Sequence, residues 1–144
     1  INKAEIQFTL LPDYYTPNHT ADTLFTPFKL YPLGVSNGSF PAGVPAGLEY
    51  NISDRYPLTS LSPLGVMDGF LHSFNRNGTT VKTFTLNIPR ELMYSISAKN
   101  DTLHLHINGT ADFYGAFHVV AGGGNHSNPI YRAKLFVVYS KLTK

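Results

Sequence analysis

The sequence predicts an all-β fold, a single β-sandwich with Greek-key or immunoglobulin-like connections, or alternatively a jelly roll. Apolar and polar residues alternate with a period of two in several short segments. Asn-Gly pairs and a glycine run, which are typical of turns, separate these segments. No segment has a convincing helical period. The length of 144 residues suits one domain with its own core.

The first half of the chain contains one clear strand and a long proline-rich region. The strand covers residues 4–10, where apolar and polar side chains alternate. The apolar face of this strand consists of Ala4, Ile6, Phe8 and Leu10. Eight of the ten prolines then fall between Pro12 and Pro63. Because proline inside a strand restricts it to an edge or a loop, we expect this region to be irregular, with two or three short strands.

The second half predicts a series of strands joined by turns. Alternation predicts strands at 83–88, 92–98 and 103–107. Residues 113–120 and 131–139 are apolar on both faces, so we expect them to be central strands. The expected turns are Asn77-Gly78 and Asn108-Gly109 as tight hairpins, Asn100-Asp101 between two strands, and a loop at 122–125.

Composition excludes several classes of partner. Only 14% of the residues are charged, the net charge is +2, and the Lys and Arg residues are scattered. A nucleic-acid or anionic-membrane surface would instead concentrate basic residues, so neither partner is expected. No stretch approaches the ~18 apolar residues of a transmembrane helix. The chain has no cysteine, so its stability must come from its core or from assembly.

Acceptor triplets for N-linked glycans are the most frequent motif. Seven Asn-x-Ser/Thr triplets occur, whereas random placement of the same residues would give about two. Their acceptors are Asn18, Asn37, Asn51, Asn77, Asn100, Asn108 and Asn125. We therefore expect an extracellular protein that carries N-linked glycans on solvent-facing asparagines. The first 17 residues contain no acceptor.

Motifs for catalysis or metal binding are weak. His104 and His106 would share one strand face, as in metal-binding cupins, but no glutamate follows them, so we expect a solvent-facing polar face. Carboxylates in the proline-rich half could form a glycosidase pair, but the sequence does not pair them: Asp13, Asp22, Glu49, Asp54 and Asp68. No nucleophile elbow or phosphate loop occurs. We expect no catalytic residue, no cofactor and no metal, with a secreted hydrolase as a minor alternative.

The 4–10 strand has two possible partners. It can pair within its own domain, which is the ordinary outcome. It can also enter the sheet of a neighbouring subunit, where backbone hydrogen bonds bind it and Ala4, Ile6, Phe8 and Leu10 set its register. The chain then divides into a donor strand at 1–11, a hinge linker at 12–17 and a glycosylated domain at 18–144. Head-to-tail donation does not close, so it generates a filament.

The profile resembles archaeal surface-filament subunits of the donor-strand type, the adhesive threads in particular. The features that resemble them are the acceptor triplets, the absence of cysteine, the low charge, the Tyr- and Thr-rich strands and the initial segment AEIQFTLL. The resemblance implies a homopolymer of identical glycosylated β-sandwich subunits in a cell-surface filament that serves adhesion or aggregation.

A second hypothesis is a glycosylated surface binding module, either lectin-like or a viral spike or capsid sandwich. It predicts that residues 4–10 pair internally and that some aromatic side chains form a sugar-binding platform. The chain has nine Tyr and ten Phe. We expect most of them to fill the core and subunit contacts, where aromatic rings bury large areas.

Overall fold

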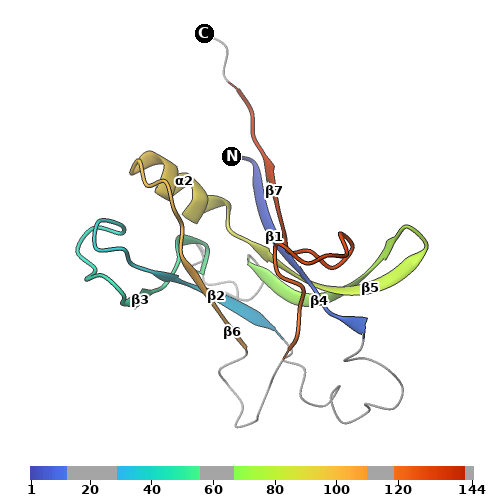
Figure 1. Ribbon diagram of the computed structural model, residues 1–144. Coiled ribbons are helices and arrows are strands. Elements are labelled where there is room, and N and C mark those ends of the chain that lie inside the picture. Colours follow the sequence, from blue (N-terminus) through green and yellow to red (C-terminus); the bar gives the residue numbers. More distant parts are fainter. Residues whose placement is uncertain (13–28, 56–66, 110–118, 142–144) are drawn as a thin grey trace.

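The protein is described by a computed structural model, which places residues 1–12, 29–55, 67–109 and 119–141. These residues form two antiparallel sheets and one short helix (Figure 1), which confirms the predicted all-β class. In chain order, the elements are β1 (Lys3–Thr9), β2 (Leu30–Val35), β3 (Glu49–Tyr50), the 3₁₀ turn η2 (Ser53–Arg55), β4 (Asp68–Arg76), β5 (Thr79–Asn87), α2 (Pro89–Ser97), β6 (Leu105–Gly109) and β7 (Lys134–Val138).

The larger sheet has the strand order β4-β5-β1-β7, so the N-terminal strand lies in its interior. On one side, Phe8 of β1 is opposite Phe84 of β5. On the other side, Ile6 is opposite Leu135 of β7. The smaller sheet has the order β3-β2-β6. Figure 1 shows β7 running beside β1, while β2 and β6 lie on the other side of the molecule.

In the described residues the core consists of two clusters, and the N-terminal segment 3–10 contributes to both. Ala4 packs with Ile52, Met67 and Ile88. Leu10 packs in the second cluster, which joins β5 to β2 of the smaller sheet through the following buried residues: Leu30, Phe84 and Leu86. These contacts connect the two sheets. The closure into a single sandwich with Greek-key or jelly-roll connections remains a prediction.

The Asn77-Gly78 hairpin is confirmed. It joins β4 to β5, whose residues pair from Arg76 opposite Thr79 back along both strands. Asn77 has a φ of 53° and Gly78 a φ of 79°. Two consecutive positive φ angles define the turn type that matches the twist of two-residue hairpins, and Asn-Gly is its preferred sequence.

The predicted strand at 92–98 is wrong, because residues 89–97 form helix α2. The period-two pattern misleads since the helix buries polar residues: Glu91 and Ser95, four positions apart, face inward, while Ile96 is 59% exposed. Pro89 at the first helical position, followed by an acidic residue in the first turn, was the available signal for a helix start.

Three other expectations also fail. Segment 131–139 was expected to be a central strand, but β7 is at the edge of the described sheet. Asn108 and Gly109 lie within β6, not in a turn. Pro32 lies in β2, the middle strand of its sheet. Proline is tolerated there because β3 pairs only with the end of β2, at Gly34 and Val35.

Some expectations fall outside the described residues. Of the predicted strand at 113–120, only residues 119 and 120 are described, and neither belongs to a strand. The hinge at 12–17 is described only at Pro12. Within the part of the chain that is placed, no helix has the length and hydropathy needed to span a membrane.

Candidate functional site

The N-terminal strand β1 is held on both sides by its own chain. Its backbone pairs with β5 from Glu5 to Thr9 and with β7 from Lys3 to Gln7. On its apolar face, Ala4 and Leu10 are buried, and Ile6 and Phe8 are half-buried against the core clusters. The predicted donor strand therefore pairs internally in this single chain.

The opposite face of β1 is polar, but it is also largely buried. Thr9 is fully buried, and its hydroxyl lies 3.2 Å from the hydroxyl of Thr83 on β5. Arg76, at the end of β4, donates hydrogen bonds to the Thr9 hydroxyl at 3.1 Å and to the Gln7 side-chain oxygen at 2.5 Å. It also donates to the carbonyl of Ile130 at 2.9 Å. Arg76 thus connects β4, β1 and the loop before β7.

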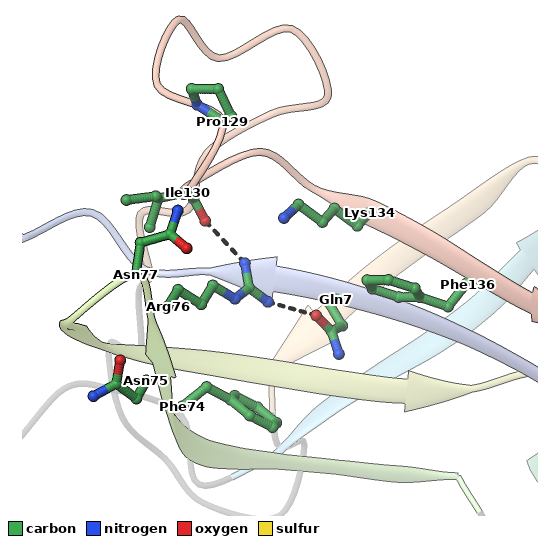
Figure 2. Close-up of a pocket in the computed structure, with 9 residues that line it drawn as sticks. All are labelled: Gln7, Phe74, Asn75, Arg76, Asn77, Pro129, Ile130, Lys134 and Phe136. Atoms are coloured by element: carbon green, nitrogen blue, oxygen red, sulfur yellow. Dashed lines mark hydrogen bonds between the residues drawn. The ribbon is translucent and has the colours of Figure 1, made fainter.

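A pocket of about 480 Å³ lies next to this arginine, on the outer face of the larger sheet (Figure 2). Strands β1, β4 and β7 and the loop before β7 form its walls. The residues that define its chemistry are Gln7, Phe74, Arg76, Ile130, Lys134 and Phe136. In Figure 2, the Lys134 side chain extends toward the region above Arg76, the Phe136 ring lies beside Gln7, and the Phe74 ring lies below both Arg76 and Gln7 in the view. The volume is within the range of small-molecule sites.

The pocket combines two cations with exposed aromatic rings. All three acceptors that bind Arg76 are neutral, and no carboxylate in the placed parts of the chain pairs with Arg76 or Lys134. The rings of Phe74 and Phe136 are 37% and 45% exposed. These two rings are exceptions to the expectation that most aromatic side chains fill the core and subunit contacts, an expectation that stays a prediction for the chain as a whole. The pocket can therefore accept an anionic group beside an apolar face.

Four of the acceptor asparagines are exposed: Asn37, Asn51, Asn77 and Asn125. Asn100 and Asn108 are half-buried, and Asn18 lies outside the described residues. Asn77 also lies at the rim of the pocket. Among the six described acceptors, these four are therefore the most accessible from solvent.

Two acceptors are linked to each other. The side-chain nitrogen of Asn37 donates to the side-chain oxygen of Asn100 at 2.9 Å. The nitrogen of Asn100 itself donates twice, to the Ser95 hydroxyl at 3.1 Å and to the Thr102 carbonyl at 2.6 Å. An N-linked glycan replaces one amide hydrogen, so it would require Asn100 to give up one of these two bonds.

The two histidines do not assemble a metal site within the residues that the structure places. His106 is exposed and hydrogen-bonds through Nδ1 to Glu49 of the neighbouring strand β3. His104, also exposed, precedes β6. A glutamate, Glu49, does lie beside His106. It is far from His106 in the sequence, so a motif of neighbouring residues does not reveal it.

The carboxylates of the proline-rich half serve different local structures. Asp68 accepts hydrogen bonds from Thr85, from His72 at 2.9 Å and from the backbone of Phe70 at 3.2 Å. Burial alone would raise the pKa of Asp68, but these bonds together hold that pKa below its usual range. Asp13 and Asp22 lie outside the described residues.

Asp54 caps helix α2 from a separate segment. Its carboxylate accepts the backbone N–H of Arg90 at 3.1 Å and of Glu91 at 2.8 Å. Glu91 in turn accepts hydrogen bonds from the Tyr50 hydroxyl and the Ser53 backbone, both at 2.8 Å. Burial raises the pKa of Asp54 and of Tyr50. Every polar group here has a structural partner, so the cluster anchors the helix.

Comparison of the chain with family models, curated proteins and solved structures gives no match. The site therefore has to be interpreted from its own geometry. Arg76 and Lys134 could not be found from a single sequence, because nothing in it indicates that residues of the two edge strands β4 and β7 line one pocket.

Proposed function

We propose that this protein is a structural subunit of an extracellular glycosylated filament, assembled by donation of β1 to a neighbouring subunit and serving cell adhesion or aggregation. The observation that supports this proposal most is the place of β1. It is the first strand of the chain, yet it fills an interior position between β5 and β7. Removing it would leave an empty slot between β5 and β7. Apolar side chains that β1 now covers, including Phe84 and Leu86 of β5, would then be exposed in this slot.

A strand that leaves such a slot is replaced best by an identical strand. Exchange of an identical element between protomers preserves every contact, so its cost is concentrated in the connecting segment. The same pairs, Phe8 with Phe84 and Ile6 with Leu135, would form between two chains. Exchange that continues head to tail produces an open polymer instead of a closed dimer.

The distribution of acceptor asparagines is compatible with this assembly. β1 contains no acceptor triplet, so no glycan would obstruct its insertion. The exposed acceptors lie on loops and on a hairpin tip. Glycans at these positions would cover the outside of each subunit and leave the strand slot free.

A surface binding module, lectin-like or part of a viral particle, is the second candidate. The internal pairing of β1 favours it, because that hypothesis requires the strand to stay in its own sheet. This candidate predicts a monomer or closed oligomer and no filament.

Negative-stain microscopy of the glycosylated protein, with and without residues 1–11, tests the proposal. We expect filaments from the full chain and none from the truncated chain. Adding a peptide of residues 1–11 should then cap the empty slot without restoring polymers. The full-length variant Lys3→Ala is the matched control, because Lys3 is exposed and its loss leaves the apolar face intact. Filaments that persist without residues 1–11 would refute donation by β1.

A further inference from the structure

We infer that the pocket beside Arg76 binds a saccharide that carries a carboxylate, such as a uronic acid. The Arg76 guanidinium has more hydrogen-bond donors than partners among the described residues. Arg76 has five N–H donors, and three hydrogen bonds to Thr9, Gln7 and Ile130 account for three of them. These bonds fix the orientation of the side chain, and the two other donors have no partner among the residues that the structure places. A fixed guanidinium with free donors is suited to a carboxylate, which it can bind in a bidentate manner.

Lys134 supplies a second positive charge at the same cavity. It lies opposite Gln7 on the adjacent strand and lines the same pocket. Among the residues with assigned positions, neither cation has an acidic neighbour within ion-pair distance. Two cations in one cavity repel each other, and an anionic ligand relieves that repulsion.

The aromatic rings indicate what the rest of the ligand is. Phe74 comes from β4 and Phe136 from β7; each exposes more than a third of its surface, and both line the cavity. A phenyl ring offers an apolar face but no hydrogen-bonding group. A pyranose ring presents C–H groups on one face, so it can stack on such a ring while its carboxylate reaches the cations. The Asn75 amide lies at the wall and can contact hydroxyl groups of the sugar, whereas the Gln7 amide is already hydrogen-bonded to Glu5 and Arg76.

A free inorganic anion would not use the aromatic rings, and a purely apolar ligand would leave the cations unpaired. The combination therefore favours an acidic sugar over either. The inference does not depend on polymer formation, because Gln7 occupies the same position whether β1 belongs to the same chain or to a neighbour. It can be tested on the isolated chain without any polymer readout.

The acidic sugar has two possible sources. One is an external polysaccharide or cell-surface glycan. The other is a glycan attached to Asn77, which lies at the rim of the cavity. Thr79→Ala removes the acceptor triplet and leaves Asn77 itself in the hairpin, so it separates the two sources.

The experiment titrates methyl β-glucuronide and methyl β-glucoside into the non-glycosylated full chain, followed by NMR chemical shifts or calorimetry. We expect the glucuronide to bind with a Kd of about 1 mM and the neutral glucoside to bind at least about tenfold more weakly. Lys134→Gln should weaken glucuronide binding roughly fivefold or more and leave glucoside binding unchanged. Phe136→Ala should weaken both. The matched controls Lys141→Gln and Tyr139→Ala, which are exposed and outside the pocket, should change neither.

Equal affinity for the two sugars, or no glucuronide binding up to about 20 mM, would overturn the inference. Loss of binding in the Lys141→Gln control would do the same, because it would indicate a non-specific charge effect. With glycosylated protein, weaker binding that Thr79→Ala restores identifies the Asn77 glycan as the occupant. Unchanged binding identifies an external ligand.

Discussion

Phe84 of β5 lines the slot that β1 occupies. Shortening the Phe84 side chain therefore tests whether β1 and β5 share a well-packed core. Its side chain is fully buried, lies opposite Phe8 and packs with Leu10, Leu30 and Leu86. Phe84→Ala removes a complete ring from this cluster. Such substitutions cost about 3–5 kcal/mol of the free energy of unfolding, against a total of about 5–15 kcal/mol for a domain.

Urea denaturation followed by circular dichroism measures this loss. For a slope of about 1.5–2 kcal/mol per M, the midpoint should fall by roughly 2 M. Phe74→Ala is the matched control, because Phe74 lies on β4, next to β5, is 37% exposed and should cost only about 1–2 kcal/mol. Phe84→Leu gives a milder change, roughly 1–2 kcal/mol, if the alanine variant does not fold. Equal losses for Phe84→Ala and Phe74→Ala would refute the packing described here.

Three further predictions concern the loops, the acid response and the helix. Mass spectrometry of the glycosylated protein should find a glycan on Asn37 and little or none on Asn100, because both amide hydrogens of Asn100 already donate hydrogen bonds. A higher glycan occupancy at Asn100 than at Asn37 would contradict this prediction. The pKa of Asp68 is lowered in the fold, so its carboxylate stabilises the protein above about pH 4, and this contribution disappears as the pH falls through the folded pKa. Asp68→Asn should therefore lose less stability than the wild type between about pH 5 and pH 3 in urea titrations, and parallel losses would exclude this role. Asp54→Ala removes the acceptors for two amides of α2 and should cost roughly 1–3 kcal/mol by the same assay, whereas a loss below about 0.5 kcal/mol would exclude capping by Asp54.

Local patterns predicted the strands whose two faces differ. β1 and β5 alternate between apolar and polar residues; β1 was predicted within one residue of its bounds, whereas the prediction at 83–88 found only the second half of β5. The hairpin between β4 and β5 was predicted because Asn-Gly favours two consecutive positive φ angles. These features depend on neighbours in the sequence, so one sequence suffices to find them.

Features that depend on distant residues were missed. Helix α2 buries Glu91 because Tyr50 and the Ser53 backbone donate to it, and no hydropathy pattern can anticipate those partners. β7 was expected to be central from its composition, yet its place in the sheet is decided by pairing with β1. The pocket likewise depends on distant residues, because strands β1, β4 and β7 contribute Gln7, Arg76 and Lys134 to one cavity.

A cysteine pair at positions 9 and 83 tests the central proposal, donation of β1, most directly. Thr9 and Thr83 are directly opposite each other with hydroxyls 3.2 Å apart, and the natural chain has no cysteine to interfere. Adjacent antiparallel strands bring opposite Cα atoms within the range that a disulfide can span. The variant Thr9→Cys/Thr83→Cys would be kept reduced during assembly, then oxidised and run on a non-reducing gel. Donation of β1 predicts a ladder of covalent multimers, with none from either single variant. A monomer band alone, containing an internal disulfide, would contradict donation and favour the surface binding module.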